Sequence, residues 1–105
     1  MTSPQGPSLD ALTDGLAEEL DGVSTSVAGE VTSYTRGGTT FARAASDRLE
    51  VRMPDDIADA ALRTAETSRI PDAAGWIRFT PTSDERHVID RAEAWFVTAW
   101  RHAIA

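Results

Sequence analysis

The chain has 105 residues, which is a typical length for one domain. With 41% hydrophobic and 26% charged residues, it has the composition of a chain that buries a core rather than a disordered one. It contains no cysteine, which excludes a disulfide scaffold, a thiolate zinc site and a cysteine nucleophile. No apolar run approaches the roughly 20 residues of a membrane span, and the N-terminus lacks the pattern of a signal peptide. We therefore expect a cytoplasmic protein without membrane contact.

The net charge of −7 is distributed unevenly. Residues 1–35 contain six acidic residues and no cation, whereas residues 36–105 contain ten Arg and eleven acidic residues. The acidic balance argues against nucleic-acid binding by the whole surface, although a local basic face is compatible with it. Every cation is Arg and none is Lys. This fits either a general compositional bias or selection for planar, bidentate contacts with anions.

The N-terminal segment contains two prolines and a glycine, and residues 1–7 are predicted to be disordered. A helix is predicted over residues 8–20, because leucines recur at steps of three and four and share one helical face. These leucines are Leu9, Leu12, Leu16 and Leu20. Gly22 is placed to end the helix.

Four segments in the first half of the chain have the features of strands, with abundant Val, Thr and Ser or a period of two. They are residues 23–27, 30–35, 39–45 and 48–53. Gly37 and Gly38 predict a tight turn between the second and third strands. In the fourth strand apolar and charged side chains alternate strictly, which is typical of a half-buried antiparallel strand.

The second half of the chain predicts two helices and one strand. The elements are a helix over residues 55–65, a connection over 68–75, a strand over 76–80 and a helix over 82–103. Pro54 ends the preceding strand, and Asp55 and Asp56 favour a helix start by capping and by their charge. Thr82 and Glu85 have the spacing of a capping box for the last helix.

The predicted order is αββββαβα, which defines an α+β fold. Alternating strands need a cover for their apolar side, and the three amphipathic helices provide it. We therefore predict a two-layer sandwich, in which three helices lie on one face of a mainly antiparallel sheet of four to five strands. One domain spans residues 8–105.

The same alternation predicts the side chains on the opposite face of the sheet. If the apolar residues of strands 48–53 and 76–80 face the helices, their Arg and Trp residues point away from them. The predicted binding residues are Phe41, Arg43, Arg48, Arg52, Trp76 and Arg78, with Tyr34 as a further candidate.

This Arg-rich and aromatic face has three interpretations. It is an ordinary solvated sheet surface with cross-strand ion pairs, a protein or self-association interface, or a site for a small anionic or nucleic-acid ligand. Arg and Trp are enriched in interface hot spots, and they also stack on planar ligands. The sequence leaves these alternatives open.

The common catalytic motifs are absent from the sequence. It lacks a Gly-x-Gly-x-x-Gly loop, a Walker-type Lys and a Gly-x-Ser-x-Gly elbow. His87 and His102 are separated by about 22 Å along one helix and cannot share a metal ion. The repeat of Asp84, His87 and Asp90 is typical of a solvated helix face. We therefore predict no catalytic residue, no metal site and no cofactor.

From Thr40 onward the chain resembles a family of unknown function, the "luciferase domain" proteins of bacteria and fungi. The resembling features are Phe41-Ala42, the strand that runs into Pro54, the helix that follows it, Ile70-Pro71, Gly75-Trp76-Ile77 and the long C-terminal helix. Members of that family usually carry histidines after the Phe-Ala segment. Arg43, Ala44 and Ala45 stand there in this chain, so no role of those histidines is carried over. The element order is more distantly similar to YjbR-like double-wing domains.

Two functional hypotheses follow from the sequence. The first is a non-catalytic binding or protein-interaction module that uses the Arg/aromatic face to bind a protein partner or a second copy. The alternative is an enzyme or ligand-processing accessory with a pocket near Trp76 and residues 69–75. The missing motifs favour the first hypothesis, and an exposed flat face or a concave pocket distinguishes the two.

Overall fold

The computed structural model describes residues 9–64, 66–71, 73–81 and 86–103. The predicted disordered segment 1–7 and the predicted capping box of Thr82 and Glu85 lie outside the described residues. The elements are α1 (Leu9–Glu19), β1 (Val23–Ala28), β2 (Val31–Arg36), β3 (Thr39–Ala44), β4 (Leu49–Arg52), α2 (Asp55–Ala61), β5 (Thr67–Arg69), β6 (Trp76–Phe79) and α3 (Arg86–Arg101).

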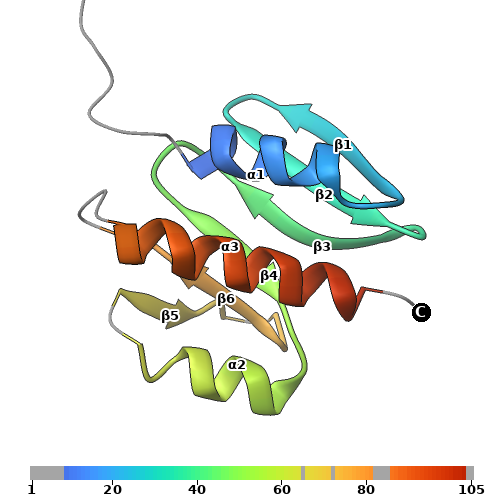
Figure 1. The fold of residues 1–105 in the computed structure, drawn as a ribbon. Helices are drawn as coiled ribbons and strands as arrows, with labels where there is room; N and C mark the ends of the chain where they lie inside the picture. The colour runs from blue at the N-terminus through green and yellow to red at the C-terminus, as the bar shows by residue number, and fades with distance from the viewer. Residues whose placement is uncertain (1–8, 65, 72, 82–85, 104–105) are drawn as a thin grey trace, which may run out of the picture.

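The strands form one antiparallel sheet in the order β1-β2-β3-β4-β6-β5. The edges of this open sheet are therefore β1 and β5, while β4 lies between β3 and β6 (Figure 1). The α+β class and the element order confirm the prediction. The described residues contain six strands rather than four to five, because β5 forms where the sequence predicts no strand, at the start of the predicted connection over 68–75.

The helices cover one face of the sheet. Phe96 of α3 packs against Tyr34 of β2 and Phe41 of β3, with ring centroids 5.0 and 5.3 Å away. At the other end of the sheet, Trp95 of α3 meets Phe79 of β6 edge to face. The fully buried side chains of Leu49, Val51 and Ile77 lie in the same core. Burial of these side chains provides the main driving force for this two-layer arrangement.

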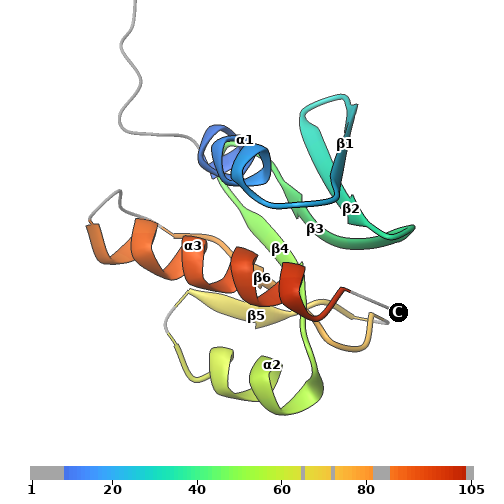
Figure 2. The same ribbon diagram turned by 45° about the vertical axis from the view of Figure 1, so that its right-hand side comes forward.

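Helices α1 and α2 lie toward opposite ends of the sheet (Figures 1 and 2). α1 contacts β1, β2 and β3, and α2 contacts β6. The hydroxyl of Thr67 in β5 donates hydrogen bonds to the carbonyls of Ala61 and Thr64 at the end of α2. α2 ends at Ala61, before the predicted end at residue 65, and its buried residues are Ala58 and Ala61.

A β-bulge sets the orientation of the side chains in β3. Tyr34 pairs with Ala42, but the next residue, Thr35, pairs with Thr40, so that Phe41 is the extra residue of β3. Two consecutive residues, Phe41 and Ala42, are therefore both buried. A bulge re-aims side chains in this way because one residue of the strand has no partner opposite it.

Trp100 fixes the C-terminal part of α3 to the other end of the chain. Its indole Nε1 donates a hydrogen bond of 3.0 Å to the carbonyl of Asp21, in the α1–β1 turn. The Arg36 guanidinium lies 4.1 Å from the Trp100 ring centroid and donates a hydrogen bond to the Trp100 carbonyl. These contacts join the end of α3 to the α1–β1 turn and to β2.

Candidate functional site: the open face of the sheet

The sheet face opposite the helices carries most of the predicted binding residues, and we call it the open face. Strand pairing places Arg43 opposite Glu50, Glu50 opposite Arg78, and Arg52 opposite Trp76. Directly paired residues of antiparallel strands project to the same side. The buried neighbours of these residues in β4 and β6 project toward the helices. The predicted orientation is thus confirmed for these strands.

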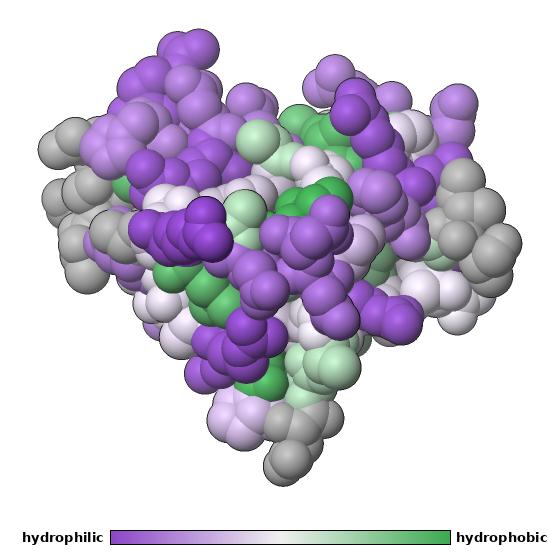
Figure 3. Space-filling view, turned by 90° about the horizontal axis from the view of Figure 1, so that it is seen from below, coloured by the Kyte–Doolittle hydropathy of each residue, from purple (hydrophilic) through white to green (hydrophobic). Residues whose placement is uncertain are grey.

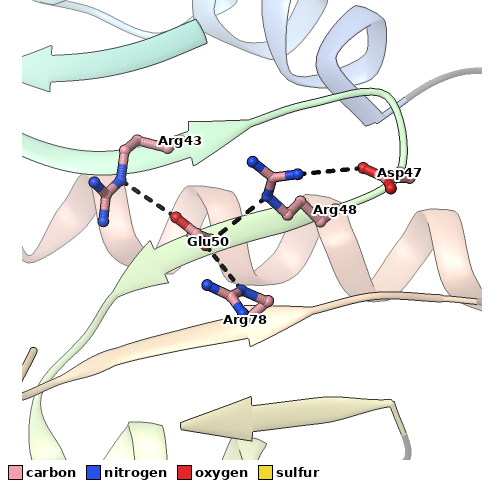
Figure 4. Close-up of polar contacts among 5 residues, drawn as sticks. All are labelled: Arg43, Asp47, Arg48, Glu50 and Arg78. Carbon is pink, nitrogen blue, oxygen red and sulfur yellow. Dashed lines mark hydrogen bonds and ion pairs between the residues drawn. The ribbon is translucent and has the colours of Figure 1, made fainter. Parts of the chain in front are cut away.

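Glu50 lies at the centre of a cluster with three guanidinium groups, which we call the Glu50 cluster (Figure 4). Nε of Arg78 donates a hydrogen bond of 2.9 Å to Glu50 Oε2. Nε of Arg43 lies 3.4 Å from Oε1, and Nε of Arg48 lies 3.9 Å from Oε2. The Glu50 side chain is only 12% exposed, whereas its three Arg partners are each about 40% exposed. The mostly buried Glu50 carboxylate is therefore in contact with three half-exposed guanidinium groups.

The open face has more cationic groups than carboxylates to neutralise them. Arg48 also lies 3.6 Å from the Asp47 carboxylate, so two carboxylates stand against the three guanidinium groups of the Glu50 cluster. Arg52 is exposed and makes no ion pair with a described residue. A guanidinium group carries five N–H donors, and among the described residues the side-chain hydrogen bond of the Glu50 cluster uses Nε of Arg78. The half-exposed Arg side chains therefore have further donors for an anion.

Trp76 provides the aromatic component of the open face. The guanidinium carbon of Arg43 lies 4.5 Å from the Trp76 ring centroid, within the range of a cation–π contact. The Trp76 side chain is partly exposed. This contact joins the aromatic ring of the open face to the Arg43 guanidinium, which also pairs with Glu50.

Two aromatic residues predicted for this face lie on the helix side instead. Phe41 is 1% exposed and Tyr34 is fully buried, and both contact Phe96 of α3. The predicted placement of Phe41 beside Arg43 is wrong because the bulge interrupts the alternation between them. The predicted placement of Tyr34 is wrong because it pairs with Ala42, which faces the core.

The open face also has a hydroxyl-rich half that the sequence analysis did not identify. Its members, which we call the hydroxyl row, are Ser24, Ser26, Ser33, Thr35 and Thr40. Pairing of β1 with β2 and of β2 with β3 places them together, and the hydroxyls of Thr35 and Thr40 lie 3.3 Å apart. The sequence signal for them is the alternation in β2: because Tyr34 faces the core, its neighbours Ser33 and Thr35 face the opposite side, and so do their pairing partners. These short polar side chains flank the longer Arg side chains of β3, β4 and β6.

Tyr34 has a structural role between α1 and β2. Its hydroxyl donates a hydrogen bond of 2.5 Å to Asp14 and lies 2.7 Å from the hydroxyl of Thr13. Burial is the main cause that raises the pKa of Tyr34 well above its usual value, and the hydrogen bond to Asp14 raises it further. Tyr34 therefore stays neutral at physiological pH and is a hydrogen-bond donor rather than a base.

A cleft of about 620 Å³ lies next to the open face. It is lined by Thr39, Arg52, Met53, Pro54, Asp55, Ala74, Gly75, His102 and Ala103. Ala74 and Gly75 belong to the connection where the alternative hypothesis predicts a pocket. Trp76 follows them in sequence but is not part of the lining. Arg52 contributes to both the cleft and the open face.

The part of the chain that the structure describes has neither a metal-binding cluster nor a membrane-spanning helix. The described residues contain no group of three or more His, Cys, Asp or Glu side chains positioned to hold a metal ion. Within the same part of the chain, no helix is long and apolar enough to cross a membrane. Seen from below, the molecule is mainly hydrophilic, and hydrophobic residues form only small separate patches on the coloured part of that surface (Figure 3). On this side, charged and polar groups dominate the contacts offered to a partner.

Comparisons with models of known protein families, with curated proteins and with solved structures found no match. The resemblance to the luciferase-domain family and the more distant likeness to YjbR-like domains therefore stay predictions. The functional argument rests on the geometry of the site.

Proposed function

We propose that the protein is a non-catalytic binding module whose open face binds an acidic segment of a partner protein. The observation that carries this proposal is the three half-exposed guanidinium groups around the one carboxylate of Glu50, on a sheet face that no described helix covers. Arg and Trp together are typical of interface hot spots, because they combine apolar area with directed hydrogen bonds.

An acidic protein segment fits this surface better than the other anionic partners. Carboxylates match the fork of an Arg side chain in geometry and charge. The net charge of −7 repels the long, densely charged backbone of nucleic acid more strongly than the few carboxylates of a short peptide segment. The hydroxyl row adds hydrogen-bonding groups that suit a polypeptide backbone next to the cationic strip.

The proposal is tested with a short polyglutamate peptide as the probe, titrated into the protein in a calorimeter. We expect Arg52→Glu to weaken binding at least about tenfold, because Arg52 has no ion pair to lose among the described residues and its reversal adds repulsion. Arg63→Glu is the matched control, because Arg63 is also exposed but lies after α2, away from the open face. Equal losses for both variants would contradict a localised site.

The double variant Arg52→Glu/Arg78→Glu extends the test to the Glu50 cluster. It should abolish peptide binding while the circular dichroism spectrum remains that of the folded domain. Sedimentation of the protein alone distinguishes self-association from binding of a different partner. Tighter binding of a single-stranded oligonucleotide than of polyglutamate would overturn the choice of partner.

The cleft lined by Arg52, Asp55 and His102 supports a second candidate function, the binding of a small molecule. Its volume lies in the range of small-molecule sites, and cationic, acidic and hydroxyl groups converge on it. A ligand panel with nucleotides and flavins, read out by thermal shift, tests this candidate because a bound ligand stabilises the folded state. A shift that His102→Ala removes and Arg63→Glu leaves intact would support the cleft.

A further inference from the structure

The β1 strand is an edge of the sheet without the usual protection. It is six residues long, five of them are exposed, and its sequence contains neither a charged residue nor a proline. The opposite edge, β5, has only three residues and carries Arg69. Short length and charge are two ways in which proteins prevent an edge from pairing with another chain, and β1 uses neither.

The outer side of β1 has backbone groups available for pairing. Its inner side pairs with β2 along the whole strand. Within the described residues, no backbone hydrogen bond joins β1 to any other segment. Val27 of this strand is 71% exposed, the large hydrophobic residue most open to solvent in the described part of the chain. β1 thus presents both hydrogen-bonding groups and an apolar side chain at the margin of the sheet.

A groove of about 420 Å³ runs between β1 and α1, which lie side by side in Figures 1 and 2. Asp14, Ala17 and Glu18 of α1 form one wall. The rest of the lining comes from the strands and consists of Val23, Thr25, Val27 and Thr32. The groove therefore combines two carboxylates with two valine side chains.

We infer that the β1 edge binds an extended basic segment of a partner protein, which adds a strand beside β1 and places Lys or Arg side chains in the groove next to Asp14 and Glu18. Strand addition supplies affinity through main-chain hydrogen bonds, and alternate side chains supply specificity. The charge of the segment follows from the groove, whose charged lining residues are the carboxylates Asp14 and Glu18. The groove lies on the helix side of β1, opposite the open face, and its charged lining residues are acidic rather than basic.

A second copy of this chain fits the edge poorly. Symmetric pairing of two β1 strands would bring two acidic α1 helices toward each other, with like charges opposed. A basic partner segment has no such cost. We therefore assign the edge to a different protein rather than to a homodimer.

The test uses a peptide of about six residues, a typical strand length, with alternating lysine and valine. Glu18→Lys should weaken binding at least about tenfold because Glu18 lines the groove. Glu19→Lys is the matched control, since it makes the same charge change at the next residue, which does not line the groove. Amide hydrogen exchange of residues 23–28 should slow when the peptide is bound. Two further peptides carry N-methyl groups on the odd or on the even amides, which leaves their charge unchanged. The peptide whose methylated amides point toward β1 should no longer bind, because those amides can no longer donate hydrogen bonds to it.

Each outcome decides the inference. Equal losses for Glu18→Lys and Glu19→Lys, or full binding of both N-methylated peptides, would reduce the contact to diffuse electrostatic attraction and overturn it. Dimerisation of the protein alone that slows exchange in β1 would show that a second copy is the occupant and would overturn it as well. Polyglutamate binding to the open face is measured separately, so failure here leaves that proposal standing.

Discussion

Arg78 lies directly opposite Glu50 across strands β6 and β4, and its Nε donates a hydrogen bond of 2.9 Å to the Glu50 carboxylate. Glu50→Gln preserves the shape of this side chain but removes the charge that holds three guanidinium groups together. We expect the free energy of unfolding to fall by about 1.5–3 kcal/mol, the range for hydrogen bonds to charged groups. Urea denaturation measures this loss.

The same substitution should strengthen polyglutamate binding, because the variant no longer carries the carboxylate that competes for the Arg side chains. Asp47→Asn is the control, since Asp47 is 79% exposed and contacts only Arg48. It should change stability by less than about 0.5 kcal/mol, as exposed ion pairs do. A Glu50→Gln protein as stable as the wild type would show that the Glu50 cluster is an ordinary solvated ion pair.

Because the pKa of Tyr34 is raised in the folded protein, we expect the free energy of unfolding to decrease at alkaline pH. The unfolded chain releases the tyrosine proton near pH 10, whereas the folded protein retains it because burial raises the pKa of Tyr34. Above about pH 10 the unfolded state therefore binds fewer protons, and the free energy of unfolding falls by up to about 1.4 kcal/mol per pH unit. Below that pH the contribution is fully present. Urea denaturation at a series of alkaline pH values measures the slope.

The composition makes this measurement specific. Tyr34 is the only tyrosine, and the chain has no lysine that titrates in the same range. The tyrosinate absorbance of the folded protein should therefore appear only as it unfolds. Tyr34→Phe should remove the alkaline slope and lower stability at neutral pH by about 1–2 kcal/mol through the lost hydrogen bonds. A tyrosinate signal near pH 10 in the folded protein contradicts the prediction.

Strand orientation was predictable where the alternation is local and uninterrupted. In β4 and β6 apolar residues recur at every second position. Pro54 lies just after the end of β4, and Gly75 directly precedes β6. The sequence therefore predicts the outward position of Arg52, Trp76 and Arg78. β5 has no comparable signal, since Thr-Ser-Arg is polar throughout, and it forms because β6 offers it a pairing edge.

The open face could be predicted only in part, because its shape depends on contacts between distant residues. The bulge at Phe41 arises from the register of β3 on β2, which no local pattern reveals. Arg43 lies on the open face as predicted, but a simple alternation with Phe41 does not place it there, because the bulge lies between them. Its position follows instead from its pairing with Glu50. The groove beside β1 depends on how α1 packs, which helix periodicity does not specify.

Gly75 is required by a close approach between two chain segments. Its φ of +82° is a conformation that residues with side chains rarely adopt, and an added Cβ would lie 2.8 Å from the Met53 carbonyl oxygen. Gly75→Ala should therefore lower the free energy of unfolding by at least about 1–3 kcal/mol. Gly15→Ala is the matched control, because Gly15 lies within α1 and an added Cβ would meet no atom within 4 Å. It should raise stability by about 0.5–1 kcal/mol through better helix propensity. Opposite signs in urea denaturation confirm the assignment, and a Gly75→Ala protein as stable as the wild type would mean that β4 and the start of β6 are not held at this short separation.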